Sequence, residues 1–535
     1  MSTTYGFATV DPKNGSVITN QRVSRREMLR EALGMATGIA AAGPMSTSRA
    51  GFALAGLLGA EGRVHPATGQ ATQGGSHQMR RSAGSRMAAD VVRVDPTVRL
   101  QTVEGWGTSL AWWASVIGGW SEATRNAIAD LVFNPLGGLG LNVVRYNIGG
   151  GDDPRHDHMR PGAAVPGYQP APGVWDWNAD ANQRWMLLAA QARGATAFEA
   201  FSNSPPYWMT RSGCTSGADD GTNNLHDAYV DRFAHYLAEV VAYFRNNWGL
   251  RFQTIEPFNE PSIRNWRRFH NQEGCHTSRA QQRAVIARLR THLTARGVTD
   301  TTIAAADEYS TEDILKTLDA YEGTALSHLS RINTHSYCAT RRADVRARAT
   351  AAGKGLWMTE YGTGGGPHDR HAIGPALRLA AHIRRDMNEL QPTAWVYWQA
   401  VEHEEGNNWG FIHADFTGAS EQYWLTKQYY GMAHYSRFIR PRYQILGVSN
   451  ESAVAAYEHA SGTLVIVHDN SAAHDMPVCF DLSGFSSLAP FAIAYRTSPT
   501  ENLARTADLP LSGKVLAVTA PAQSITTYVL TAVAL

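Results

Sequence analysis

The sequence predicts a (β/α)8 barrel joined to an all-β sandwich. Three observations support this fold class. Between about residues 104 and 432, eight short apolar segments alternate with amphipathic helical segments. After residue 433, short strands separated by turn signals follow one another without a helix, which is typical of a sandwich. Two similar strands, at 90–96 and 98–103, precede the barrel, and we expect them to join the sandwich.

The barrel strands are nearly continuous apolar runs, as in parallel strands that are covered on both faces. They are expected at 103–110, 141–148, 195–202, 251–258, 301–308, 331–337, 355–361 and 393–400. Helices are expected between them, for example at about 225–246 and 371–389. A doubly wound sheet is the competing fold, but no Gly-rich phosphate turn follows the first strand. The loop GTGGGP (362–367) lacks nucleotide-binding spacing, so we interpret it as backbone room near a ligand.

The domain boundaries follow from these changes of pattern. Residues 89–103 hold the strands that join the side β-domain, 104–432 the barrel and 433–535 the sandwich. In residues 1–60, paired arginines Arg25 and Arg26 precede an Ala/Gly-rich run, which is typical of a twin-arginine export signal. The alternative is a chance arginine pair in a disordered tail. Residues 61–88 are expected to be linker, and no later run reaches membrane-spanning length, so we predict a secreted protein.

Composition and cysteine count exclude several classes of partner. The net charge of +1 gives no electrostatic footprint for nucleic acid or an anionic membrane, and a monomer is expected. Four cysteines are too few for a disulfide scaffold or zinc ribbon. One disulfide, between Cys214 and Cys275, is an alternative that the sequence does not decide. The segment HDHM (156–159) supplies no tetrahedral ligand set by itself. We therefore predict no metal and no cofactor.

Two carboxylates stand at the strand ends where a barrel carries its active site. Glu260 follows the fourth strand within FQTIEPFNEP (252–261), and Glu360 ends the seventh. An ionised carboxylate is costly to bury unless a partner or the chemistry requires it. A pair of carboxylates across a barrel mouth suits sugar hydrolysis, in which one protonates the leaving oxygen and the other attacks or activates water. The other strand ends supply Arg145, Asp152, Trp208, Asn259, His335, Tyr337 and Trp398.

An ordered set of motifs resembles glycoside hydrolase family 30, and within it the branch that contains endo-β-1,6-galactanases. The motifs are GWGTSLAWW (105–113), NVVRYNIGGGDDP (142–154), SNSPPYWM (202–209), EPFNEP (256–261), THSY (334–337), WMTEYG (357–362) and QSITTYVL (523–530). The resemblance covers about 90–535. It implies a retaining glycosidase acting on a polysaccharide or oligosaccharide, with Glu260 as acid/base and Glu360 as nucleophile.

The resemblance also implies roles for the neighbouring residues. Asn259 would hold the 2-hydroxyl, and Arg145 would hydrogen-bond Glu360 and keep it ionised. Asp152 would bind distal hydroxyls, and Trp208 and Trp398 would line the sugar subsite. His335 and Tyr337 would orient the nucleophile or the substrate.

Each role has a structural alternative. Trp208 and Trp398 could be barrel core, and Arg145 could pair with Asp307 or Glu256. Glu256 is a rival acid, but it lies within its strand, below the mouth. The cluster Glu402, Glu404 and Glu405 follows the eighth strand and is expected to form a solvated rim.

The expected activity is hydrolysis of β-linked galactan, most like an endo-β-1,6-galactanase. The alternatives are an exo-acting relative (a galactobiohydrolase, fucosidase, xylosidase or glucosidase) or a non-catalytic carbohydrate-binding barrel. Loops at 150–175 and 262–280 are expected to rise around the mouth. Their ring-bearing residues, Tyr168, Trp175, Trp177, Trp266 and His270, would be platforms for several sugars in an open cleft. Closure of one end by these loops would instead favour exo attack.

Overall fold

The computed structural model describes residues 9–10, 17–18, 89–364, 369–403 and 409–535, in two units, 1–87 and 88–535. In the first unit, the described residues form one antiparallel pair, β1 (Thr9–Val10) with β2 (Val17–Ile18). The rest of the predicted export signal and the linker lie outside the described residues. Within the described part of the chain, no helix has both the length and the apolar character needed to cross a membrane.

Eight parallel strands close into a barrel, which confirms the predicted fold class. They are β4 (Gly105–Ser109), β5 (Val143–Asn147), β6 (Ala197–Phe201), β7 (Thr254–Glu256), β8 (Thr302–Ser310), β9 (Leu329–Cys338), β10 (Gly355–Glu360) and β11 (Ala394–Gln399). Each pairs with its neighbour in sequence order, and β11 closes onto β4. Every residue of β5 and β6 is buried, as expected for strands covered on both faces.

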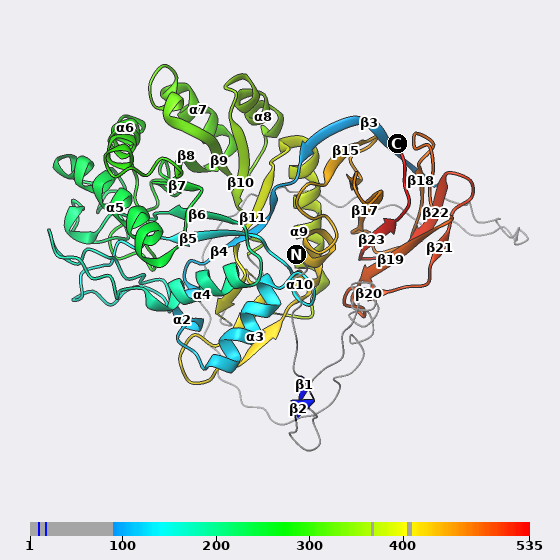
Figure 1. Ribbon diagram of the computed structural model, residues 1–535, viewed down its shortest axis with the longest axis horizontal. Coiled ribbons are helices and arrows are strands. Elements are labelled where there is room, and N and C mark those ends of the chain that lie inside the picture. The colour runs from blue at the N-terminus through cyan, green and yellow to red at the C-terminus, as the bar shows by residue number, and fades with distance from the viewer. Residues whose placement is uncertain (1–8, 11–16, 19–88, 365–368, 404–408) are drawn as a thin grey trace, which may run out of the picture. The chain divides into compact units, whose positions relative to one another are not determined.

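Helices cover the outside of the barrel (Figure 1). They are α2 (Trp113–Ile117), α3 (Glu122–Phe133), α4 (Ala181–Ala192), α5 (Val230–Trp248), α6 (Arg279–Ala295), α7 (Thr311–Tyr321), α8 (Arg342–Ala351), α9 (Ile373–Arg385) and α10 (Lys427–Ser436). The two helices predicted at 225–246 and 371–389 are confirmed as α5 and α9. The first ends at Trp248 and is followed by Gly249, whose φ of 65° is the left-handed conformation common just after a helix. The second continues as a π-helical turn at Asp386–Leu390.

The sandwich is built from both ends of the described chain. Its strands are β3 (Asp90–Thr102), β15 (Gln444–Val448), β16 (Ala453–Glu458), β17 (Thr463–Asn470), β18 (Met476–Asp481), β19 (Phe491–Thr497), β20 (Ala504–Arg505), β21 (Leu509–Pro510), β22 (Val515–Ala520) and β23 (Ser524–Leu530). Strand β3 pairs antiparallel with β15 and parallel with β18, so it belongs to both layers (Figure 1). Phe480 of β18 contacts Tyr528 of β23 across the core, with ring centroids 5.3 Å apart.

Two details differ from the sequence expectation. The two strands predicted at 90–96 and 98–103 form one 13-residue strand, β3, whose register with β15 shifts between Asp95 and Arg99. Pro96 lacks an N–H and lies within this bulge, which explains why the sequence looked interrupted there. A small sheet also follows the barrel, consisting of β12 (Val401–His403), β13 (Ile412–Ala414) and β14 (Tyr423–Leu425).

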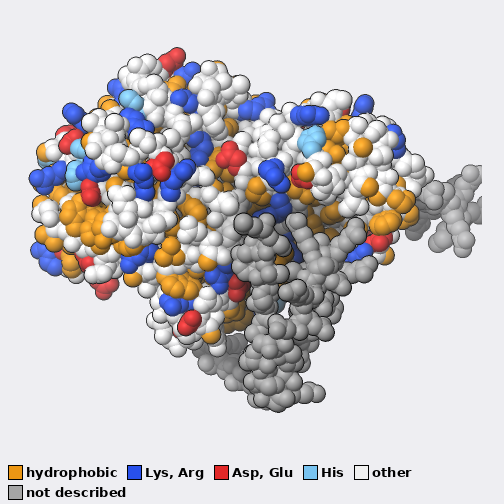
Figure 2. Space-filling model, viewed as in Figure 1, with side chains coloured by type: hydrophobic (Ala, Val, Ile, Leu, Met, Phe, Trp, Pro, Cys, Tyr) orange, Lys and Arg blue, Asp and Glu red, His pale blue; other side chains and the backbone are white. Residues whose placement is uncertain are grey.

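A buried histidine links the barrel helices to the sandwich. His434 of α10 is fully buried, and its two ring nitrogens lie 2.7 Å from Thr527 Oγ1 and 2.9 Å from Thr497 Oγ1. Burial lowers the pKa of His434 to about 3, so the ring is neutral in the folded chain. Charged side chains, in contrast, are spread over both the barrel and the sandwich on the surface in Figure 2.

We predict that His434 makes the fold acid-sensitive. The unfolded ring takes up a proton near its ordinary pKa of about 6.5, but the folded ring does not, so stability falls as pH drops below that value, by up to ~1.4 kcal/mol per pH unit. In urea unfolding at a series of pH values, His434→Gln should flatten this slope. The exposed His474→Gln is the matched control and should keep the slope. An unchanged slope in His434→Gln would contradict the assignment.

Candidate active site

The two predicted carboxylates meet at the C-terminal mouth of the barrel. Glu260 follows β7 and Glu360 ends β10; their exposed fractions are 7% and 5%. His335 of β9 lies between them, with Nδ1 3.2 Å from Glu260 Oε1 and 3.7 Å from Glu360 Oε1. One carboxylate oxygen of each glutamate and one ring nitrogen of His335 all lie within 4.8 Å of one another. The structure therefore brings Glu260, Glu360 and His335 together as predicted.

Glu260 is held in an unusual backbone conformation. Its φ is +46°, in the left-handed region that non-glycine residues rarely adopt. The Glu260 N–H donates to the carbonyl of Asp307 (2.8 Å), and the Glu260 carbonyl accepts from Trp266 Nε1 (3.1 Å). Asp307 also has a positive φ, +50°. Such strain persists only where the surroundings over-determine it, and here it fixes the direction of the Glu260 side chain.

Arg145 lies within the barrel and does not hydrogen-bond Glu360 as the resemblance implied. Its Nε donates to Glu199 (2.9 Å), a second nitrogen pairs with Asp307, and a third donates to the Thr359 carbonyl (3.1 Å). The guanidinium comes no closer than 3.9 Å to Glu360. The sequence alternative of a pair with Asp307 is thus confirmed. Glu199 was missed, because only the closed barrel shows that its side chain faces Arg145.

His335 carries a positive charge between the carboxylates. Burial alone lowers the pKa of His335, but the charge of Glu360, the hydrogen bonds to Asp307 and Glu260 and the charge of Asp307 raise it to about 10. The ring is fully buried, and Nε2 lies 3.7 Å from Asp307 Oδ1. A protonated imidazole has no lone pair for a metal, so this cluster of two glutamates and a histidine suits proton chemistry better than metal binding.

The pKa of Glu360 is raised, whereas the resemblance implied a nucleophile that Arg145 keeps ionised. Burial raises the pKa of Glu360 to about 7; the charge of His335 opposes this rise, Glu260 adds to it and Arg145 opposes it. The hydroxyl of Tyr337 donates to Glu360 Oε1 at 2.9 Å, and burial raises the pKa of Tyr337 well above its ordinary value, so the hydroxyl stays protonated. Tyr309 stacks on Tyr337 at 5.1 Å.

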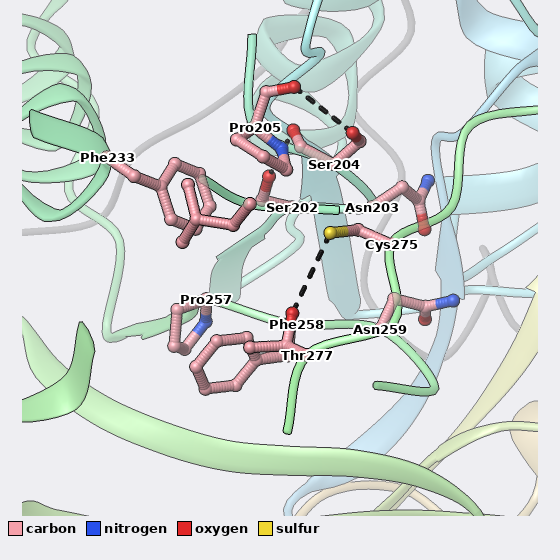
Figure 3. A pocket seen from close by; sticks show the side chains of 11 residues that line it. Ser202, Asn203, Ser204, Pro205, Phe233, Pro257, Phe258, Asn259, Cys275 and Thr277 are labelled. Carbon is pink, nitrogen blue, oxygen red and sulfur yellow. Dashed lines mark hydrogen bonds between the residues drawn. The ribbon is translucent and has the colours of Figure 1, made fainter. Parts of the chain in front are cut away.

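Asn259 offers an unused acceptor at the mouth. Its side chain is 6% exposed, and Oδ1 has no hydrogen-bond partner among the described residues. In Figure 3, Asn203 and Asn259 lie on the side of a cavity of about 10 Å³ that is opposite Phe233 and Pro257, and all four residues line it. Asn203, which follows β6, was not singled out in the sequence, because a single Asn after a strand is an ordinary loop residue.

Trp398 and Trp208, which were predicted to line the sugar subsite, have different neighbours. Trp398 is 7% exposed and meets Trp112 edge-on at 4.9 Å, and the Arg160 guanidinium lies 3.8 Å from the Trp112 ring. Trp208 donates to the Gln169 carbonyl (2.8 Å) and contacts the ring of Tyr229.

The glycine loop after β10 is explained by a side chain. A Cβ at Gly362 would lie 2.4 Å from the ring of Trp409, and one at Gly364 only 2.1 Å from it. The backbone room that we assigned to a ligand is therefore filled by Trp409 at these two positions. Residues 365–368 lie outside the described part.

The rival acids are all buried or undescribed. Glu256 is fully buried below the mouth, as expected, and burial together with Asp307 and Glu199 raises its pKa well above the ordinary value. Glu402 is 4% exposed within β12 and bonded to Gln399, so the prediction of a solvated rim is wrong for this residue. Glu404 and Glu405 lie outside the described residues.

The aromatic residues of the loop after β5 stack on one another and on α5, and the half-buried Trp175 also lines a pocket with Gln169 and His235. Tyr168 is fully buried, and Trp177 stacks at 3.6 Å on Tyr243 of α5 and at 4.8 Å on Trp175. Trp266, in the loop after β7, is only 6% exposed.

The two long loops themselves contact each other. The Arg160 N–H donates to the Asn271 carbonyl (3.0 Å), and a ring nitrogen of His158 lies 2.6 Å from the His270 carbonyl. Only β6 separates β5 from β7 in the barrel, so this contact builds a wall on one side of the mouth.

Asp152 belongs to this wall. Its Oδ1 accepts from the Thr215 N–H, and its Oδ2 lies 2.9–3.0 Å from ring nitrogens of His156 and His158. Both oxygens are thus engaged within the protein, which leaves little for the distal sugar hydroxyls that the resemblance implied. Cys214 lies beside this group, and both Cys214 and Cys275 are free thiols, so the disulfide left open by the sequence is not formed.

Comparison with known proteins places the chain among sugar-cleaving enzymes. Residues 89–408 match the model of O-glycosyl hydrolase family 30. The chain is 35% identical over 412 residues to an endo-beta-1,6-galactanase of Hypocrea rufa, which covers 72% of this chain and 82% of that relative. It is 26% identical to an exo-beta-1,6-galactobiohydrolase of Bifidobacterium longum subsp. longum, which covers 78% of this chain and 37% of that protein.

Solved structures agree on the fold. The catalytic domain of GH30 xylanase C from Talaromyces cellulolyticus superposes with a TM-score of 0.63 at 22% identity, covering 82% of this chain and 100% of that one. The family model matches more than half of this chain, and the galactanase relative aligns over most of both proteins. The chain therefore belongs to O-glycosyl hydrolase family 30 and is a glycoside hydrolase.

Proposed function

We propose that this enzyme hydrolyses β-1,6-galactan internally, with retention of configuration. The observation that carries the mechanism is the short distance, within 4.8 Å, between carboxylate oxygens of Glu260 and Glu360. Retaining glycosidases hold their carboxyl groups about 5–5.5 Å apart, whereas inverting enzymes need roughly 6.5–9.5 Å to admit a water molecule. The arrangement thus favours direct attack by one carboxylate.

In the first step, a Glu360 oxygen attacks the anomeric carbon while Glu260 gives its proton to the leaving oxygen. The glycosidic bond breaks and an ester to Glu360 forms. Ester formation removes the charge of Glu360, and the His335 imidazolium then faces the new carboxylate of Glu260. In the second step, Glu260 takes a proton from water, the hydroxide attacks the anomeric carbon, and Glu360 leaves as a carboxylate.

The neighbouring residues position these two groups. Tyr337 holds one Glu360 oxygen by its hydroxyl, and the free Oδ1 of Asn259 is available to a sugar hydroxyl beside the nucleophile. Arg145 acts at a distance from the sugar, by holding Asp307, whose carbonyl fixes Glu260. It is a positioning residue.

The likeness to the Hypocrea rufa endo-beta-1,6-galactanase supports the choice of substrate and of internal attack. A polymer outside the cell also agrees with the export signal expected from Arg25 and Arg26. The wall formed by the loops after β5 and β7 leaves open exo attack as a second candidate, which the likeness to an exo-beta-1,6-galactobiohydrolase supports.

A matched pair of variants separates the two carboxylate roles. Glu360→Gly should lose on the order of 10⁴-fold or more in kcat, because the nucleophile is gone. With azide and an aryl galactoside it should form the α-glycosyl azide, since the anion takes the nucleophile's place. Glu260→Ala with azide should form the β-glycosyl azide, because Glu360 still makes the ester. Nuclear magnetic resonance of the products identifies the anomer, and exchanged anomers would reverse the two assignments.

The acid limb of the pH profile should report Glu360. The group must be ionised to attack and its pKa is raised to about 7, so kcat/KM should fall about tenfold per pH unit below that value. Tyr337→Phe removes a hydrogen bond to the charged form and should move the limb upward, by roughly half a pH unit or more. Tyr309→Phe keeps the stacked ring and should leave the limb in place. An acid limb near pH 4 in the unaltered enzyme would contradict this prediction, because it would show that the charges of His335 and Arg145 lower the pKa of Glu360 more than burial raises it.

The first products of galactan digestion decide between endo and exo attack. Internal cleavage should give a spread of oligosaccharides within the first few per cent of hydrolysis, resolved by chromatography. A single product from the start, whether monosaccharide or disaccharide, would exclude internal attack and leave the carboxylate pair unaffected.

A further inference from the structure

Four side chains in the wall of the mouth direct their ligand atoms toward one point. Asp152, His156 and His158 come from the loop after β5, and Cys214 comes from the loop after β6; one ligand atom of each lies within 4.8 Å of all the others. Asp152 Oδ2 lies 3.0 Å from His156 Nδ1 and 2.9 Å from His158 Nε2. Cys214 Sγ lies 3.4 Å from His158 Nε2 and 3.7 Å from Asp152 Oδ2.

The two distances from sulfur, 3.4 and 3.7 Å, are close to the edges of a small coordination tetrahedron, and the two oxygen-to-nitrogen distances, 2.9 and 3.0 Å, would lengthen slightly around an ion. Zinc bonds of about 2.0–2.3 Å to nitrogen, oxygen and sulfur give ligand-to-ligand distances of roughly 3.3–3.6 Å. The mixture of imidazole, thiolate and carboxylate ligands also suits zinc better than the oxygen-seeking calcium and magnesium ions.

The hydrogen bonds around His158 leave one nitrogen for an ion. Its Nδ1 lies 2.6 Å from the His270 carbonyl, which can only accept, so the neutral ring carries its proton on Nδ1. The lone pair of Nε2 then faces a carboxylate oxygen and a sulfur, and a cation placed between these three atoms would satisfy all of them. A backbone carbonyl that fixes the tautomer in this way is the usual partner of a metal-bound histidine.

The other ligands are fixed as well. The Thr215 N–H holds Asp152 Oδ1 at 2.9 Å and leaves Oδ2 directed at the histidines. Cys214 is fully buried. Its backbone N–H donates to Thr210 Oγ1 (3.0 Å), which holds this part of the loop in place. Phe269 packs edge-on against both histidine rings, at 5.1 and 5.4 Å.

We propose that Asp152, His156, His158 and Cys214 bind one zinc ion that holds the wall of the mouth together. The two anionic ligands offset the charge of the divalent ion, the two imidazoles bind as neutral rings, and binding releases the thiol proton to solvent. Sequence analysis predicted no metal, because HDHM supplies only two of the ligands, its Asp157 is not one of them, and Cys214 lies far along the chain. The proposal rests on these contacts and does not depend on the substrate proposed above.

The test uses the full chain with any affinity tag removed and purified without chelator. We expect one zinc per chain by elemental analysis, and a lower melting temperature after chelation that zinc chloride restores and magnesium chloride does not. Cobalt in place of zinc should give the thiolate-to-cobalt charge-transfer band and the visible bands of a tetrahedral site. Cys214→Ser should lose that band, and both it and His156→Ala should bind zinc at least about tenfold more weakly.

Cys275→Ser is the matched control, since it removes a second buried free thiol outside the cluster, and it should keep the metal and the band. Less than stoichiometric zinc in the unaltered chain after incubation with zinc chloride would overturn the proposal. So would a Cys214→Ser variant that keeps the charge-transfer band. The partly exposed His156 provides the second variant if Cys214→Ser does not fold.

Discussion

The buried guanidinium of Arg145 is the interaction on which the active site depends. It connects β5 to Glu199 of β6, to Asp307 of β8 and to the backbone of β10, all inside the barrel. Taking such charges out of water is expensive, and removal of one partner typically costs 3–5 kcal/mol because the others remain buried and unpaired. Since the Asp307 carbonyl also holds the backbone of Glu260, the same ion pair that orders the barrel interior sets the direction of the proposed acid.

The mouth of the barrel is a small, nearly balanced set of charges. His335 supplies a positive charge to both glutamates and to Asp307, while burial acts against every charged form. Burial therefore raises the pKa of Glu360 even though the cations His335 and Arg145 lie nearby. Several ionised groups can share so small a space only because each charge has a partner of opposite sign or a hydrogen bond.

The sequence predicted what depends on local pattern. The barrel strands could be located because parallel strands buried on both faces are continuous apolar runs, and Glu260 and Glu360 because barrel sites lie at strand ends. What depends on closure or on distant segments could not be predicted. Glu199 faces Arg145 only in the closed barrel, Trp409 fills the glycine loop from 45 or more residues away, and Glu402 is buried by a small sheet that has no strong pattern of its own.

Strand β3 has a consequence for how the molecule is made. It emerges from the ribosome before the barrel, yet the Arg93 N–H binds Ser449, 356 residues later, and its parallel partner β18 follows later still. During synthesis the apolar side chains of Val92 and Val94 therefore stay uncovered until the later strands of the sandwich have been made. The sandwich can close only after β15 and β18 have been made, so a chain that stops within the barrel leaves β3 without its partners.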